Sequence, residues 1–108
     1  MSGLDNTSMT VRASTATTNV LTNNDYVLLL TPGAATAVTL PSGPLVQPGR
    51  SYTVYKTAAA FTVTITPATG TVDGGASTTL LTSQVHAKTF VTDGTNWFTI
   101  QEYDSLAA

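Results

Sequence analysis

The side chain best suited to acid-base chemistry in this chain is His86, the only histidine, which lies within a strand-like segment. Its neighbours in sequence supply no nucleophile and carboxylate arranged for a catalytic triad. Carboxylates are dispersed at positions typical of turns and strand ends, where they bond local backbone amides: Asp25, Asp73, Asp93, Glu102 and Asp104. We therefore predict that the protein is not an enzyme.

Metal and cofactor sites are not indicated either. The chain has no cysteine, which excludes disulfides and thiolate metal ligands. The glycines of residues 70–75 match neither the dinucleotide nor the phosphate-loop spacing. Asp73 alone falls short of the roughly six to eight oxygen ligands that Ca²⁺ prefers. We predict a turn at residues 70–75 and no cofactor.

Charge is scarce in this sequence. Lys, Arg, Asp and Glu make up 9% of the 108 residues, against about 25% in an average protein, and the formal net charge is -2. No basic stripe and no apolar run near the ~20 residues of a membrane span is present, so we predict neither nucleic-acid nor membrane binding. A surface poor in charge and rich in threonine favours burial against copies of the same chain, although solvated sheets also favour threonine.

The elements that must position these residues are short strands. Strand-like segments occupy residues 26–30, 36–40, 51–57, 61–66, 85–92 and 97–103, and the loop 41–50 contains three prolines and two glycines. In the segment 61–66 apolar residues alternate with threonine, so Phe61, Val63 and Ile65 should face the core. We predict an all-β fold, a small antiparallel sandwich or jelly-roll-like barrel.

Three parts are expected along the chain. Residues 1–19 are polar and without sustained periodicity, which indicates an extended N-terminal arm. Residues 20–104 carry the strand patterns and form the β-domain, and residues 105–108 form a short C-terminal tail. The arm is either disordered or extended along a neighbouring molecule, and the sequence leaves both alternatives open.

The Asp93-Gly94 pair marks a hairpin that leads into the strand of Trp97. Because side chains alternate along a strand, Trp97 lies on the face opposite Phe98 and Ile100. If those two residues face the core, Trp97 lies at the rim or between subunits.

Tyrosines and the tryptophan could form a sugar-stacking or receptor-binding patch, or pack in the core or between subunits. The run at residues 26–30 reads as a strand buried on both faces, one of which needs a partner beyond its own sheet. The residues expected at a subunit or partner interface are Tyr26, Leu28, Leu30, Tyr55, His86, Trp97 and Tyr103.

Five segments in order resemble a module of tailed-phage virion proteins, found in fibres, head spikes and capsid decoration proteins. They are VTLP at 38–41, PGRSYTV at 48–54, FTVTI at 61–65, GTVDG at 70–74 and VTDGTNW at 91–97. The resemblance covers about residues 25–100. It implies a small trimeric β-domain without catalytic residues.

Because little besides this module is present, the resemblance favours a capsid decoration (cement) protein over a fibre. It implies a homotrimer that binds the major capsid protein on the virion surface and stabilises the capsid. The alternative is a tail-fibre or head-fibre tip, an adhesin that binds a host receptor or glycan through Trp97 and the tyrosines.

Overall fold

The computed structural model describes residues 10–22, 25–41, 47–58, 60–80 and 85–104. Within these ranges all regular structure is β-strand, which confirms the all-β prediction. The strands are β1 (Thr10–Ser14), β2 (Thr18–Val20), β3 (Asp25–Leu30), β4 (Thr36–Leu40), β5 (Ser51–Lys56), β6 (Val63–Pro67), β7 (Thr78–Leu80), β8 (His86–Thr92) and β9 (Trp97–Asp104). In this part of the chain no helix is long and apolar enough to cross a membrane.

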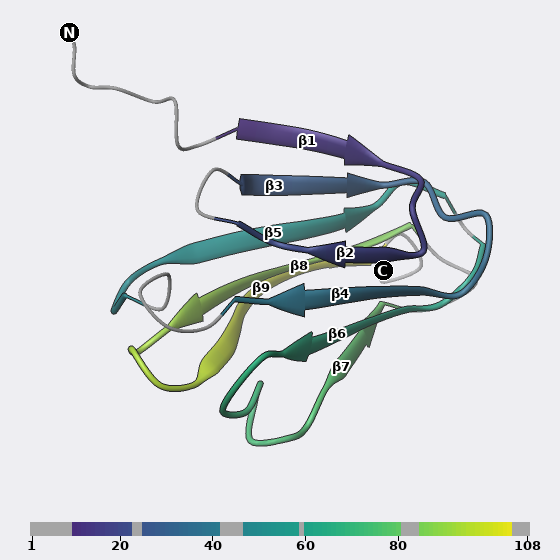
Figure 1. The fold of residues 1–108 in the computed structure, drawn as a ribbon. Helices are drawn as coiled ribbons and strands as arrows, with labels where there is room; N and C mark the ends of the chain where they lie inside the picture. The colour runs from purple at the N-terminus through teal and green to yellow at the C-terminus, as the bar shows by residue number, and fades with distance from the viewer. Residues whose placement is uncertain (1–9, 23–24, 42–46, 59, 81–84, 105–108) are drawn as a thin grey trace, which may run out of the picture.

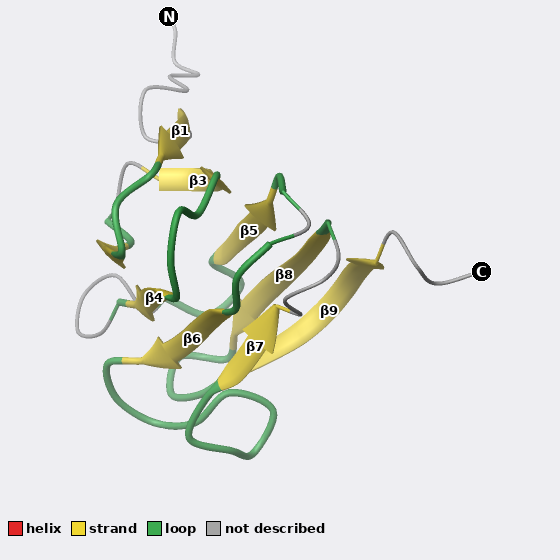
Figure 2. Cartoon of the chain, turned by 90° about the vertical axis from the view of Figure 1, so that its right-hand side faces the viewer, coloured by secondary structure: helices red, strands yellow, loops and turns green. Residues whose placement is uncertain are grey.

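The strands form two sheets that the chain visits alternately. A five-stranded sheet has the order β1-β3-β5-β8-β9, and a four-stranded sheet has the order β2-β4-β6-β7. In Figure 1 the arrows of β1, β3 and β5 point one way and those of β2, β4 and β6 point the other way. The first six strands therefore wind through three turns, and Figure 2 shows the sheets as two layers.

The predicted antiparallel arrangement is wrong for these first six strands. Pairs β1-β3, β3-β5, β2-β4 and β4-β6 are parallel, whereas only β5-β8, β6-β7 and β8-β9 are antiparallel among the described strands. The connections after β1, β3 and β5 lead into the other sheet, so the next strand does not pair with its predecessor. The alternation of residue types predicts a strand but not whether it runs parallel or antiparallel to its neighbour. In place of the predicted jelly-roll-like barrel, the structure has two separate mixed sheets.

One hydrophobic core joins the two sheets. Its members include Leu28 and Val54 from the five-stranded sheet and Val63 and Ile65 from the four-stranded sheet. The predicted alternation of β6 is confirmed for Val63 and Ile65. Phe61 precedes the strand with a positive φ of 67° and is 42% exposed, so its predicted core position is wrong. The strand begins too late to include it.

Part of the predicted N-terminal arm belongs to the sheets. Strand β1 lies parallel to β3 and β2 lies parallel to β4, so the predicted boundary after residue 19 falls inside β2. Backbone bonds to its own chain hold this segment, and residues 1–9 and the tail 105–108 lie outside the described residues. The sequence pattern missed β1 because an edge strand needs few apolar residues.

The β8-β9 hairpin is confirmed, but the predicted faces of β9 are reversed at its start, before the register shift that lies between the pairs Phe90-Thr99 and Thr89-Gln101. Trp97 is fully buried in the core, whereas Phe98 is 41% and Ile100 is 60% exposed. The segment at residues 71–75 lies beside the start of β9: the Trp97 amide donates to Thr71 O at 2.8 Å, and the Asp73 amide donates to Trp97 O. This cover buries the largest side chain of the strand, which removes more apolar surface from water than burying Phe98 would.

Candidate functional site

The outer face of the five-stranded sheet carries two cross-strand rows of side chains without any charge. The strand register places the members of each row side by side across the sheet, from β1 through β3, β5 and β8 to β9. The first row is Val11, Val27, Thr53, Thr89 and Gln101, and the second row is Ala13, Leu29, Tyr55, Ala87 and Tyr103. We call them the outer rows.

The row between them points inward and holds the charges. Arg12, Lys88 and Glu102 share that row with Leu28 and Val54. The outer face of the four-stranded sheet differs again, because its rows are mostly threonine: Thr18, Ala37, Thr64 and Thr79 in one, and Val20, Thr39 and Thr66 in the other. Aromatic side chains therefore distinguish the outer rows.

A shallow pocket lies at the β5-β8-β9 end of the outer rows. Its volume is about 330 Å³, and it is lined by Thr53, Tyr55, Ala87, Thr89, Gln101, Glu102 and Tyr103. The rings of Tyr55 and Tyr103 are nearly parallel, with centroids 6.1 Å apart and planes 9° apart. The hydroxyls of Thr53 and Thr89 lie 2.8 Å apart and share a hydrogen bond. Three strands thus build one concave surface from aromatic and neutral polar groups.

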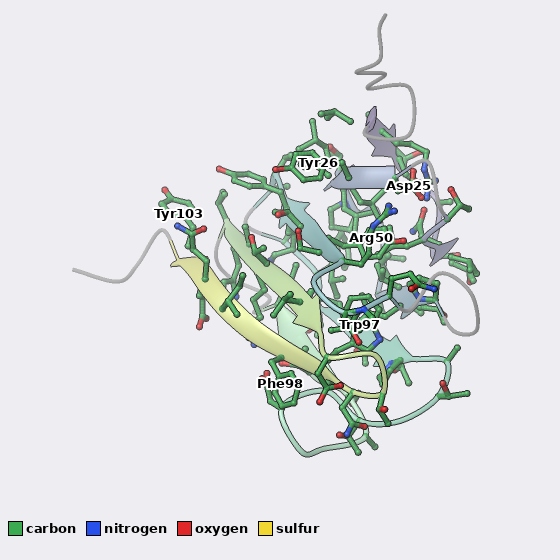
Figure 3. The ribbon with its side chains drawn as sticks, turned by 90° about the vertical axis from the view of Figure 1, so that its left-hand side faces the viewer. Asp25, Tyr26, Arg50, Trp97, Phe98 and Tyr103 are labelled. Carbon is green, nitrogen blue, oxygen red and sulfur yellow. The ribbon has the colours of Figure 1, made fainter. Side chains whose placement is uncertain are left out.

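The predicted interface residues divide into exposed and buried groups. Tyr26 and Tyr103 are 41% and 50% exposed and point away from the interior, whereas Trp97 lies between the sheets (Figure 3). Tyr55 is half-buried. The other members are buried within one chain: Leu28, Leu30, His86 and Trp97. The period-two pattern turns these four side chains toward the core of their own chain, and the interface assignment stays a prediction that the accessible Tyr26, Tyr55 and Tyr103 can still serve.

His86 belongs to a polar cluster between the sheets. Its Nε2 bonds with Glu102 Oε2, and across the β5-β8 pair it faces Lys56, which is fully buried. Lys56 donates from Nζ to Phe61 O at 3.0 Å, and burial lowers the pKa of Lys56. The described residues contain no group of three His, Cys, Asp or Glu side chains that could hold a metal ion. Lys56 was not predicted as a site residue, although it shares the inward parity of Tyr52 and Val54.

A second polar cluster fixes the start of β3. Arg12 donates from Nε to Asp25 Oδ1 at 3.0 Å and from Nη2 to Asp25 Oδ2 at 3.1 Å. The Thr22 amide donates to Asp25 Oδ2 at 2.9 Å, and Arg50 donates to the Asp25 carbonyl at 2.6 Å while its guanidinium lies 4.4 Å from the Tyr52 ring centroid.

The Asp25 carboxylate is ionised more easily than a free one. Burial by itself would raise the pKa of Asp25, but the hydrogen bonds from Arg12 and Thr22, with the charge of Arg12, hold it below its usual range. The cluster joins β1, β3 and β5, which carry the outer rows. Its role is therefore to position that surface.

Comparison with models of known protein families and with curated protein sequences found no match to this chain. The resemblance to phage virion modules therefore rests on the five sequence segments alone. The outer rows, the pocket and the charges around them are the features of this chain that bear on its function.

Proposed function

We propose that this is a bacteriophage structural protein, a capsid decoration protein that binds the head surface as a homotrimer and stabilises the capsid. The observation that carries the proposal is the uncharged outer face of the five-stranded sheet, which combines aliphatic and aromatic side chains with Thr53, Thr89 and Gln101. Together the two layers make a compact β-sandwich that serves as a building block.

The outer rows suit contact between copies because symmetry brings equivalent surfaces close together. Charged side chains near a symmetry axis would face like charges, whereas uncharged apolar groups pack without that penalty. At the β1-β3 end Val11 is 61% and Tyr26 is 41% exposed, beside half-buried Val27 and Leu29. We place the subunit contact at this end.

The major capsid protein is the proposed second partner, on the capsid surface of the virion. A sandwich with two broad uncharged faces can pair through one face with copies of itself and rest on a lattice through the other. The threonine rows of the four-stranded sheet provide hydroxyls for such contacts. Threonine is also short, so few side-chain rotamers are lost when the face is covered.

The adhesin alternative loses its central residue. Trp97 is fully buried in the core and cannot stack on a receptor without unfolding the start of β9. Tyr52 is buried as well, so Tyr55 and Tyr103 are the tyrosines of that patch that remain accessible. Capsid decoration is therefore the better supported of the two functions.

The test combines the mass of the protein in solution with its copy number in virions. Sedimentation of the purified protein should give three times the chain mass, and quantitative mass spectrometry should find hundreds of copies per particle, with matching density on the head in cryo-electron microscopy. A monomer in solution together with a handful of copies at the tail would contradict the proposal.

A further inference from the structure

We infer that the pocket lined by Tyr55 and Tyr103 is a binding site for a neutral sugar residue. It lies at the β9 end of the outer rows, away from the β1-β3 end that we assign to subunit contact. Both surfaces can therefore be used in one molecule. The volume of about 330 Å³ lies at the lower end of the ~300–1,000 Å³ typical of small-ligand sites, which suits a single ring.

The two tyrosines supply an apolar platform. Their near-parallel rings stack across β8, with centroids 6.1 Å apart, and Ala87 between them adds no bulk to the floor. Sugar rings present faces of C–H groups that pack on such aromatic surfaces. Tyr103 is half exposed, so a ligand can reach it without any strand moving.

The polar groups around the platform are those that recognise hydroxyls. Gln101 carries an amide with both donors and an acceptor, and Thr53 and Thr89 carry hydroxyls. Within the described part of the chain, the side-chain amide of Gln101 and the hydroxyl of Tyr103 have no hydrogen-bond partner. These groups are free to bond a ligand in place of water.

Charge selects the ligand class. Glu102 is the only charged residue of the lining, and its carboxylate is turned inward and bonded to His86. A phosphate or acidic sugar would therefore find no cation in the lining to neutralise its charge. A neutral hexose or N-acetylhexosamine fits the lining best, because an organic cation would leave the amide and hydroxyls without partners.

The experiment uses the intact protein and a panel of methyl glycosides of neutral hexoses and N-acetylhexosamines. Saturation-transfer NMR should show contact with at least one of them, and its titration should shift the Gln101 side-chain amide. Tyr103→Ala and Gln101→Ala should each weaken binding about tenfold or more. The spectrum of each variant reports its folding.

Tyr26→Ala is the matched control, since Tyr26 is a similarly exposed tyrosine outside the pocket lining. It should retain sugar binding even where it weakens the oligomer, which separates this inference from the proposed capsid function. The inference is overturned if no glycoside binds, if both pocket variants bind as the wild type does, or if tetramethylammonium binds the pocket and no sugar does.

Discussion

At the scale of single residues, Trp97 and Phe98 give the sharpest test of how β9 is oriented. The first is fully buried and the second is 41% exposed. Trp97→Ala should lower the free energy of unfolding by about 3–5 kcal/mol, because it leaves a cavity in the shared core. Phe98→Ala should change it by only about 0.5 kcal/mol, as surface substitutions do. Urea unfolding measures both, and equal losses would show that the faces are assigned wrongly.

The indole nitrogen of Trp97 adds a detail to this residue. It is buried and makes no hydrogen bond in the described part of the structure. An unpaired buried donor is costly, so the indole is kept for its size and its contact with Tyr52, whose ring centroid lies 5.7 Å away. Packing therefore outweighs hydrogen bonding at this position.

Asp25 should make the stability of the fold depend on pH in acid. Its folded-state pKa lies below the unfolded value of about 3.9. The stabilisation is therefore complete above that pH and is lost as the pH falls through the folded-state pKa. Asp25→Asn should cost about 1–3 kcal/mol at pH 7, and this difference should shrink below about pH 4.

The partner variant controls for general damage to the strand. Arg12→Gln alone should destabilise the protein at pH 7, but it should cost little when Asp25→Asn is already present, because the two side chains bond directly. Chemical unfolding of the four proteins from pH 7 down to pH 3 measures the coupling. A cost of Asp25→Asn that stays constant over this range would contradict the assigned ion pair.

At the scale of elements, the connection between β6 and β7 is locked to the β8-β9 hairpin. Gly70 has a φ of +75°, and an added Cβ would collide with Thr95 O and with the Asn96 side chain. Next to it the Thr71 amide donates to Asn96 Oδ1 at 3.0 Å, and the Thr99 amide donates to Asp73 Oδ1 at 2.7 Å. The two turns therefore hold the two sheets in place.

Gly70→Ala should consequently destabilise the protein by about 1–3 kcal/mol through backbone strain and collision. Gly33→Ala is the matched control, because a Cβ there meets no atom within 4 Å, and its effect should stay within about 0.5 kcal/mol. Thermal unfolding compares the two variants. If Gly70→Ala melted with the wild type, the interlock of the turns would not contribute to stability.

What the sequence could predict at this scale is local. The alternation of apolar residues with threonine placed Val63 and Ile65 in the core, and the Asp93-Gly94 pair marked the hairpin. Both signals can be read from a few consecutive residues. The parallel order of the strands depends on connections that cross between sheets, and the Arg12-Asp25 pair joins residues 13 apart. A sugar-stacking patch of tyrosines was one alternative from the sequence, but the pairing of Tyr55 with Tyr103 follows only from the register of three strands.

At the scale of the whole molecule, the winding of the chain creates two outer faces of different chemistry. Each parallel strand adds one member to every row, so the outer rows combine aliphatic, aromatic and neutral polar groups while the rows of the other sheet become mostly threonine. Arg12, Lys88 and Glu102 lie in the inward row, and Asp73 and Asp93 lie in turns. Such segregation favours association through one defined face and argues against association in random orientations.

Val11→Lys should therefore abolish self-association while leaving the subunit folded. Val11 is 61% exposed in the outer rows, where a lysine would meet lysines of its neighbours or lose water on burial. Val20→Lys is the control, because Val20 is 56% exposed on the other sheet and should keep the assembly intact. Sedimentation measures the association of both variants. Repeated at two salt concentrations, it should show that the wild-type assembly does not weaken as salt rises, since no ion pair holds the proposed contact. Dissociation by Val20→Lys alone would move the subunit contact to the four-stranded sheet.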